Sequence, residues 1–394
     1  MQHEPLPDLN NTQIAFARFS NAELRASYWL FRLMGQPWLV EVGSRLAQWF
    51  IRMGLPVQWA IRHTIYRQFC GGETIGGCEP SIAQLSRGGV GTILDYSVEG
   101  AEGDAAFDAC AGEIIRTIQQ ARGDERIPFA VFKISGVAPV DLLERVSQNP
   151  EVTGNDLQEW NAVRARVRRI IQAAADARQP VLVDAEESWI QDAIDGLVHE
   201  NILEFNRAMP LVYQTVQLYR HDRLGYLKDT FGRMSAQGCY FAVKLVRGAY
   251  LEKERDRAAE LGYPCPIQPD KAATDRDFDE AVRFCLTHLD RMAVCCGSHN
   301  ETSNQSMVSQ MRELGIAPND PRVWSAQLKG MSDHISFNLA DAGYRVAKYL
   351  PYGPVPSVLP YLVRRARENT SIAGQMSREL ALLAAERRRR RGAS

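Results

Sequence analysis

Two adjacent arginines near the end of the chain, Arg364 and Arg365, have the residue type and spacing best suited to specific chemistry. A guanidinium group binds a carboxylate through two parallel hydrogen bonds, and neighbouring helix residues point about 100° apart, so a ligand can be held from two sides. Glu368 follows at helical pairing distance from both arginines. The same spacing also fits an exposed Arg–Glu cluster worth roughly a few tenths of a kcal/mol. Spacing alone therefore leaves carboxylate binding and surface pairing both open.

Polar or ionisable residues also end most of the short apolar runs in the rest of the chain. They are Asp95, Lys133, Asp184, Glu186, Glu187, Gln214, Gln217, Lys244, Arg247, His299, Asn300, Gln327 and Tyr349. Mixed charges of this kind suit a small zwitterion, because arginines bind its carboxylate and acids balance the arginines. A lysine inside a barrel, Lys133 or Lys244, would alternatively form a Schiff base with a carbonyl substrate. The acids at 184, 186 and 187 are not a complete metal-ligand set, and no HExxH, Walker A or GxSxG motif occurs.

The elements that carry these residues alternate between strand and helix patterns. Helical periodicity covers residues 106–121, 159–177, 190–209, 275–289 and 304–314. The predicted strands are Gly91–Tyr96, Phe129–Ile134, Val181–Asp184, Leu211–Val216, Tyr240–Val246, Met292–Cys296, Val323–Leu328 and Tyr344–Tyr349. This alternation predicts an α/β fold, a (β/α)8 TIM-type barrel with its chemistry at the C-terminal ends of the strands. A doubly wound open sheet is the alternative, but the glycines at 88, 89 and 91 precede a strand, where that fold needs them to open a helix.

The predicted organisation is an N-terminal helical arm (residues 1–87), the barrel (88–385) and a basic tail (386–394). The arm is unusually aromatic, with Trp29, Phe31, Trp38, Trp49, Phe50 and Trp59 in one stretch. These residues fit either packing on the barrel or an amphipathic surface that faces a membrane or a partner. The run Arg387–Arg391 is expected to be a frayed, solvated tail, with contact to an anionic membrane or another acidic partner as the alternative.

The bulk properties narrow the class of protein. The chain has 394 residues, 45% hydrophobic and 24% charged, and a formal net charge of −1, so no overall field attracts nucleic acid. Eight cysteines without a CxxC pair are expected to be free thiols in a reducing compartment. The sequence starts with polar, acidic residues and shows no secretory or membrane-spanning segment, so a bacterial cytosolic protein is expected.

Several ordered motifs carry a resemblance to a known family. They are Lys244-Leu245-Val246-Arg247-Gly248-Ala249-Tyr250, Lys348–Val355 followed by Tyr361–Arg365 and Glu368-Asn369, and the shorter Val183–Glu186, Ser298–Asn300 and Gln327–Met331. From about residue 60 to residue 385 the chain resembles the proline dehydrogenase (proline oxidase) family, and within it the monofunctional, eukaryote-like branch. The resemblance implies an FAD-dependent oxidoreductase.

The same resemblance implies roles for individual residues. The substrate-site residues it implies are Lys133, Asp184, Tyr250, Leu328, Tyr349, Arg364 and Arg365. Of these, the two arginines and Lys133 would serve the proline carboxylate, Asp184 would hold the ion pairs, and the remaining three would pack around the ring. The FAD contacts it implies are Gln214, Lys244, Arg247, Gly248, Thr274, Ser298, His299, Asn300 and Glu368. Lys244 stands where bacterial bifunctional members often have an arginine near flavin N5.

The resemblance also implies the reaction and its partners. A hydride would pass from the carbon beside the proline nitrogen to flavin N5, giving Δ1-pyrroline-5-carboxylate, and the electrons would pass to a quinone at a membrane surface. A separate pyrroline-5-carboxylate dehydrogenase would act downstream. The implied location is cytoplasmic, with peripheral attachment to the inner membrane. Tyr349 favours proline, because hydroxyproline dehydrogenases typically have a smaller residue there; 4-hydroxyproline dehydrogenase and a Schiff-base lyase are the alternatives.

Overall fold

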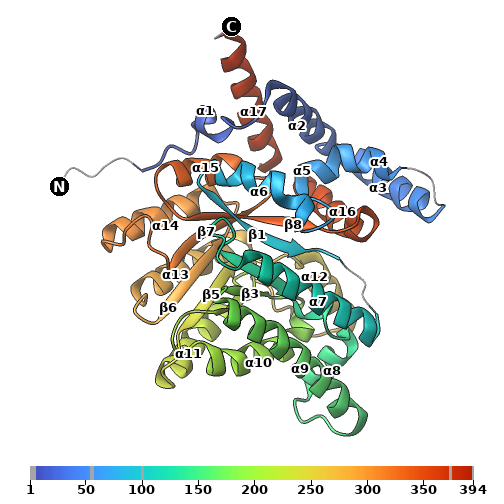
Figure 1. Ribbon diagram of the computed structural model, residues 1–394, viewed down its shortest axis with the longest axis vertical. Helices are drawn as coiled ribbons and strands as arrows, with labels where there is room; N and C mark the ends of the chain where they lie inside the picture. The colour runs from blue at the N-terminus through green and yellow to red at the C-terminus, as the bar shows by residue number, and fades with distance from the viewer. Residues whose placement is uncertain (1–5, 54–56, 99–101, 372–374, 393–394) are drawn as a thin grey trace. The chain divides into compact units, whose positions relative to one another are not determined.

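Eight parallel strands close into a barrel in sequence order, β1 to β8, which confirms the predicted (β/α)8 fold (Figure 1). The computed structural model describes residues 6–53, 57–98, 102–371 and 375–392. The strands are β1 (Val90–Tyr96), β2 (Phe129–Lys133), β3 (Val181–Asp184), β4 (Val212–Gln217), β5 (Phe241–Val246), β6 (Met292–Gly297), β7 (Val323–Leu328) and β8 (Val346–Tyr352).

Helices follow every strand and also precede the first one. Those before β1 are α1 (Thr12–Ala15), α2 (Asn21–Met34), α3 (Pro37–Arg52), α4 (Gln58–Ile61), the π-helix η1 (Arg62–Tyr66), α5 (Arg67–Phe69), the 3-10 turn η2 (Gly76–Cys78) and α6 (Glu79–Ser86). Those between the strands are α7 (Asp104–Ala121), η3 (Ile134–Gly136), α8 (Val140–Gln148), α9 (Gly154–Ala177), α10 (Ser188–Phe205), α11 (Arg223–Ala236), α12 (Leu251–Leu261), α13 (Lys271–Thr287), α14 (Glu301–Glu313) and α15 (Asp333–Asp341). After β8 come α16 (Val355–Ser371) and α17 (Gln375–Gly392).

The chain forms two compact units, and one of them is discontinuous in sequence. Unit 1 comprises residues 1–99 and 327–394, and unit 2 comprises residues 100–326. The N-terminal helices therefore share a unit with β1, β8 and the C-terminal helices. The predicted division into arm, barrel and tail stays a prediction, although the boundary at residue 386 falls inside the continuous helix α17.

Aromatic rings fill the inside of the barrel strands that belong to unit 2. The ring centroid of Phe129 on β2 lies 5.2 Å from that of Tyr213 on β4 and 5.4 Å from that of Trp324 on β7. These strands are not neighbours in the barrel, so the three side chains meet through its interior. Because side chains alternate along a strand, Tyr213, Thr215 and Gln217 share the inner face of β4.

In unit 1, β1 and β8 pair in parallel from Val90↔Val346 to Tyr96↔Tyr352. Helix α2 begins with a capping box, in which Ser20 and Glu23 satisfy each other's backbone N–H groups. Helix α3 packs against both α2 and α16, and a buried cluster that includes Phe31, Phe69 and Leu362 joins the N-terminal helices to α16. The N-terminal arm is thus anchored to the helix that carries the paired arginines.

The expected fraying at Arg387–Arg391 is wrong, because these residues form the last turns of α17, although Arg388, Arg389 and Arg391 are exposed to solvent as expected. Glu386 is fully buried and pairs with Arg389 Nε at 2.8 Å and Arg390 Nε at 2.7 Å. Arg390 also donates to the carbonyl oxygens of Phe16 and Phe19, each at 2.7 Å. A buried carboxylate and the carbonyl groups that follow α1 therefore keep this part of the arginine run folded.

All eight cysteines are free thiols, as expected from their spacing. Burial raises the pKa of Cys295 to about 12, and it raises the pKa of Cys296 as well. Both therefore remain protonated and unreactive at neutral pH.

Candidate active site

Asp184 and Lys244 form an ion pair inside the barrel at the carboxyl ends of β3 and β5. Lys244 Nζ lies 2.6 Å from Asp184 Oδ1, and the two side chains are only 8% and 15% exposed. The strand β4 separates β3 from β5, so this pair spans the interior. A charged pair held in this position can orient a polar ligand and balance its charge.

A second carboxylate, Glu186, lies just beyond the end of β3. It accepts hydrogen bonds from the backbone N–H of Ser135, at 2.9 Å, and from the Ser135 hydroxyl. Burial raises the pKa of Glu186, and the charge of Lys133 at the end of β2 opposes that shift. The ends of β2 and β3 therefore bring Lys133, Asp184 and Glu186 into one polar region of unit 2.

The Gln214 side chain points away from the barrel interior, toward α10. Its Nε2 donates to Asp195 Oδ1 at 2.8 Å, and its Oε1 lies 3.2 Å from His199 Nε2. Asp195 and His199 belong to α10, in the helix layer outside the strand. The flavin contact predicted for Gln214 is therefore not supported by its position.

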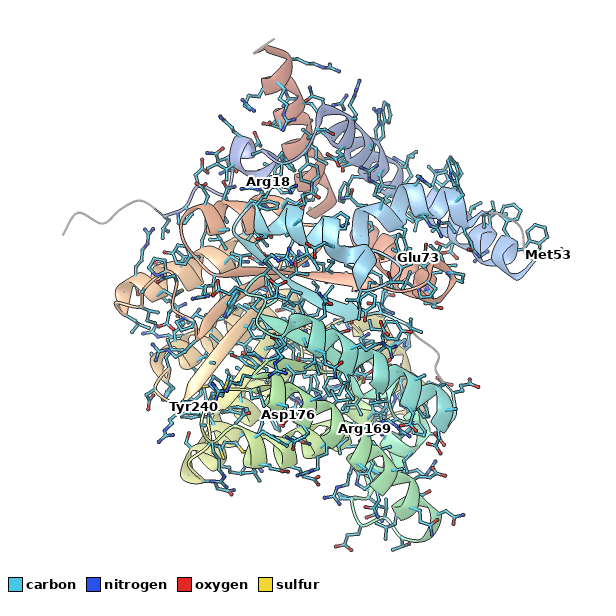
Figure 2. The ribbon with its side chains drawn as sticks, viewed as in Figure 1. Arg18, Met53, Glu73, Arg169, Asp176 and Tyr240 are labelled. Atoms are coloured by element: carbon cyan, nitrogen blue, oxygen red, sulfur yellow. The ribbon has the colours of Figure 1, made fainter. Side chains whose placement is uncertain are left out.

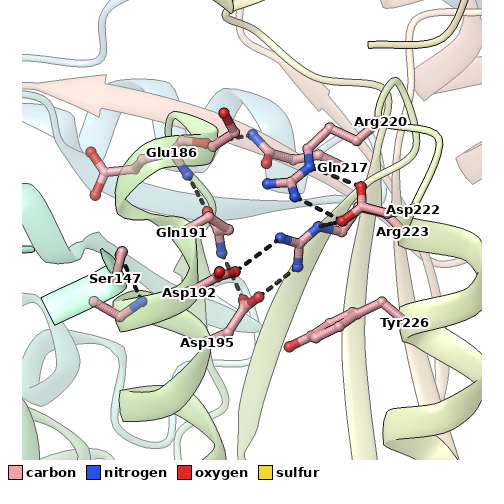
Figure 3. Close-up of polar contacts among 12 residues, drawn as sticks. Ser147, Glu186, Gln191, Asp192, Asp195, Gln217, Arg220, Asp222, Arg223 and Tyr226 are labelled. Atoms are coloured by element: carbon pink, nitrogen blue, oxygen red, sulfur yellow. Dashed lines mark hydrogen bonds and ion pairs between the residues drawn. The ribbon is translucent and has the colours of Figure 1, made fainter. Parts of the chain in front are cut away.

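Gln217 is the glutamine that points inward. Its Nε2 donates to the Glu186 carbonyl oxygen at 3.0 Å, whereas its buried Oε1 has no hydrogen-bond partner among the described residues. Glu186 is fixed in turn by Gln191, and Gln191 by Asp195 (Figure 3). Because side chains alternate along β4, Gln217 and Gln214 point to opposite faces of the strand, and this alternation is the sequence signal that distinguishes them.

Arg247, after β5, is held by three oxygen atoms. Its Nε lies 2.8 Å from Asp275 Oδ1, and its two terminal nitrogens donate to Ser298 Oγ at 2.8 Å and Ser303 Oγ at 2.9 Å. Burial alone would raise the pKa of Asp275, but hydrogen bonds from Lys271 and Arg247 outweigh it and lower the pKa. The guanidinium is therefore fixed in place at the ends of β5 and β6.

The predicted flavin residue Gly248 follows directly, with a φ of +146°, and any side chain there would collide with the ring of Tyr219. Glycine is thus required for the chain to leave β5 at this point.

The starts of two helices lie beside this arginine. Asp270 caps α13, which contains Thr274, and Asn300 caps α14 by accepting from Ser303 N at 3.1 Å. His299 lies between Ser298 and Asn300 in the turn from β6 to α14. Helix N-termini and a fixed arginine are suited to bind phosphate groups.

These residues of unit 2 fit an FAD molecule. The unsatisfied acceptor of Gln217 faces the barrel interior and can receive an N–H group, such as the one on the flavin ring. Lys244 supplies a cation in the same interior, while Arg247 and the α14 N-terminus supply donors for a diphosphate.

In unit 1, the predicted residues occupy the end of β7 and the middle of β8 and of α16. Leu328 ends β7, and Tyr349 is buried on β8, 6% exposed. The carbonyl oxygen of Tyr349 accepts from Lys329 N at 2.9 Å. This bond ties the chain after β7 to β8.

Arg364 and Arg365 are half-buried, and both face the ring of Tyr361, with Cζ at 6.0 and 5.5 Å from its centroid. Glu368 belongs to α16, but its side chain lies outside the described part of the structure. Tyr250 immediately precedes α12 in unit 2, where Lys253 Nζ lies 5.6 Å from its ring centroid.

Gln217→Leu is expected to weaken FAD binding about ten-fold, because the flavin would lose a buried hydrogen-bond acceptor. Titration of the flavin-free protein with FAD measures this change. Gln214→Leu is the matched control: it breaks the network with Asp195 and His199, so it should lower the melting temperature while leaving FAD affinity within about two-fold. Equal losses of FAD affinity in the two variants would contradict the assignment.

Comparisons with known proteins give a consistent result. Residues 78–378 match the protein family described as proline dehydrogenase. The chain is 30% identical to proline dehydrogenase 1, mitochondrial, of Dictyostelium discoideum, over 97% of this chain and 75% of that protein. It is 32% identical to a hydroxyproline dehydrogenase of Bos taurus, over 95% of this chain and 92% of the relative.

Among solved structures, proline utilization A (PutA) from Bdellovibrio bacteriovorus aligns with a TM-score of 0.72 at 19% identity. The alignment covers 93% of this chain and 38% of that protein. This structural likeness supports the fold.

Proposed function

Since this chain belongs to the proline dehydrogenase family, and is thus an oxidoreductase of proline catabolism, we propose that it oxidises L-proline to Δ1-pyrroline-5-carboxylate with FAD as its cofactor. The observation that best supports the cofactor is the buried, unsatisfied acceptor of Gln217, in a barrel that also holds the Asp184–Lys244 pair.

In this proposal, Arg364 and Arg365 bind the proline carboxylate through charge-assisted hydrogen bonds, and Lys133 adds a further positive charge. Asp184 balances these cations and keeps Lys244 in place. Tyr250, Leu328 and Tyr349 pack around the apolar ring and exclude water from it. A small zwitterion bound in this way presents one face to the cofactor.

The residues that we propose to contact FAD are the predicted residues of unit 2, except that Gln217 replaces Gln214. Lys244 and Gln217 contact the flavin, and the residues at the ends of β5 and β6 bind the rest of the cofactor. These residues are Arg247, Gly248, Thr274, Ser298, His299 and Asn300, and Glu368 of unit 1 remains a proposed contact. FAD held by these residues would supply the acceptor, at flavin N5, for a hydride from the carbon beside the proline nitrogen.

The proline nitrogen must be neutral when the hydride leaves. None of the residues with a proposed role at the substrate is assigned as a general base, so we propose that the amine proton passes to water before transfer. The protein then contributes orientation and charge, while the redox chemistry belongs to the cofactor.

The electrons then pass to a quinone, which requires the enzyme to lie at a membrane surface for at least part of its cycle.

The proposed location is the cytoplasm with peripheral attachment to the inner membrane, and relatives from Dictyostelium discoideum and Homo sapiens are named mitochondrial. No helix among the described residues is long and apolar enough to cross a bilayer. A separate pyrroline-5-carboxylate dehydrogenase would consume the product.

The decisive experiment follows the flavin spectrum. Purified protein should be yellow, and L-proline added without oxygen should bleach the visible flavin band. Borohydride should trap no substrate on Lys133 or Lys244. A colourless protein that does not take up added FAD would contradict the proposal, and borohydride trapping would favour the Schiff-base lyase. The pairing of Lys244 with Asp184 disfavours a Schiff base at that lysine, because a Schiff base needs a neutral amine.

Tyr349 is the residue that we propose determines the preference for proline over 4-hydroxyproline. The second substrate is an alternative because two similar proteins are named hydroxyproline dehydrogenase. Tyr349→Ser makes room for a hydroxyl group, so the ratio of kcat/KM for proline to that for 4-hydroxyproline should fall by about ten-fold or more. The variant Tyr344→Ser, which alters a buried tyrosine outside the proposed site, is the control for non-specific damage. An unchanged ratio in Tyr349→Ser would remove this residue from the specificity argument.

A further inference from the structure

The large hydrophobic side chains exposed on this protein gather on three N-terminal helices. They are Trp29, Leu33, Trp38, Val42, Leu46, Trp49, Met53 and Trp59, here called the aromatic face. Trp38 is 64% exposed and Trp59 is 69% exposed. Among the described residues, other exposed large hydrophobics occur singly at positions 6, 140, 157, 251, 261 and 314. A cluster of this kind marks an interaction surface.

The spacing of these residues shows that, within α2 and within α3, they lie on one face of the helix. On α3 they recur at steps of four, four, three and four residues, from Trp38 to Met53, which is the repeat of one helix face. Met53 directly follows Arg52, the last residue of this helix (Figure 2). On α2, Trp29 and Leu33 lie one turn apart, whereas Leu24 and Phe31 are buried in the core of unit 1. The helices are thus anchored by one side and present the other to the outside.

The surroundings of the aromatic face are basic. Residues 21–73 contain six arginines and three glutamates but no lysine or aspartate, whereas the whole chain has a formal net charge of −1. Arg45 and Arg67 have side chains that are 77% and 68% exposed, and each pairs with a glutamate, Glu41 and Glu23. Arg32 lies over the Trp29 ring at 5.0 Å. Tryptophan next to arginine is typical of proteins at a lipid headgroup boundary, where the ring is apolar and the cation meets phosphate.

The charges on this surface and the polar residues within α3 favour one kind of binding partner. A second copy packed on the same face by two-fold symmetry would bring like arginines together. An insertion across a bilayer is excluded for α3, which contains Glu41, Ser44 and Arg45. An anionic lipid surface satisfies both the apolar residues and the arginines.

We propose that the aromatic face is the surface through which this protein lies on an anionic phospholipid bilayer, with α2, α3 and α4 parallel to the membrane plane. This inference deepens the proposed function and rests on it for its purpose, since a membrane quinone must reach the enzyme. The physical binding itself requires no turnover.

The test uses the full-length, FAD-loaded protein and two kinds of vesicle, phosphatidylcholine alone and an equal mixture with phosphatidylglycerol. We expect sedimentation with the anionic vesicles, a blue shift of tryptophan emission, and weaker binding at high salt or to the neutral vesicles. Trp38→Ser/Trp49→Ser should weaken binding at least about ten-fold, and Arg45→Ala/Arg67→Ala should weaken binding to the anionic vesicles selectively. Leu261→Ser, which changes an exposed leucine of unit 2, should bind like the parent protein.

Each possible outcome decides the proposal. Absence of vesicle binding, or equal binding by the parent and the double tryptophan variant, would overturn it. A parent protein that forms larger oligomers, which the tryptophan variant loses, would assign the face to contacts between copies. The vesicle result is read without proline, so failure of the proposed oxidation would appear separately as an unbleached flavin.

Discussion

Arg364→Met is expected to raise the KM for L-proline about 100-fold or more, while the protein keeps its bound FAD. Arg364 lies half-buried on α16 with its Cζ 6.0 Å from the Tyr361 ring centroid, so the chain already restricts its position. Removal of one partner of a buried charge-assisted pair costs about 2–5 kcal/mol, and about 2.7 kcal/mol corresponds to a factor of 100. Steady-state kinetics with a soluble electron acceptor measure the change, and the flavin absorption spectrum reports the bound cofactor.

Two further variants make this prediction specific. Arg364→Lys keeps the charge but loses the planar fork, so its KM should lie between those of the parent and the methionine variant. Arg283→Met removes an exposed arginine of α13 and should leave KM unchanged. If Arg364→Met lowered the melting temperature but left KM for proline unchanged, the arginine would have only a structural role, and carboxylate binding would need another residue.

Asp184→Asn is expected to lower the free energy of unfolding by about 3–5 kcal/mol, because it removes the negative charge that Asp184 places 2.6 Å from the buried Lys244 ammonium. Asparagine has nearly the same shape as aspartate, so lost packing does not explain the effect. Urea denaturation of the FAD-loaded protein measures the stability, and proline turnover should fall at the same time.

The double variant Asp184→Asn/Lys244→Met should recover much of the lost stability, since both charges are then gone. Glu200→Gln breaks the exposed Arg164–Glu200 pair and should cost less than about 1 kcal/mol. If Asp184→Asn changed stability no more than Glu200→Gln, the interior pair would not be an important electrostatic element.

Much of the fold was predictable from the sequence because eight apolar, β-branched runs alternate with helical periodicity. Among the strands, the largest errors lie at the limits of β8, predicted from Tyr344 to Tyr349 but observed from Val346 to Tyr352. Tyr344 instead closes α15, since its N–H donates to the Leu339 carbonyl oxygen at 3.0 Å. Pro351 continues the strand, and its carbonyl oxygen accepts from Gly71 N at 2.8 Å, a long-range contact that no local pattern reveals.

The candidate site was predictable where residue type and strand position agree. Lys133 and Asp184 end their strands, and Arg247 follows its strand, as predicted. The choice between Gln214 and Gln217 required the direction of alternation along β4, which depends on the packing of Tyr213 inside the barrel. The order of the arginine run in α17 depends on the buried Glu386 and on carbonyl groups of α1, more than 360 positions away in the sequence.

The discontinuity of unit 1 sets an order of events during protein synthesis. Strand β1 pairs with β8, and α1 contacts α17, so α1 and β1 await partners that are synthesised much later. At about 5–20 residues per second, the stretch between β1 and β8 takes roughly 10–50 s to synthesise. Unit 2 is continuous and can begin to fold within this interval. The tryptophan-rich arm meanwhile remains without its α16 and α17 neighbours, so chaperone demand and aggregation risk should concentrate in the nascent N-terminal segment.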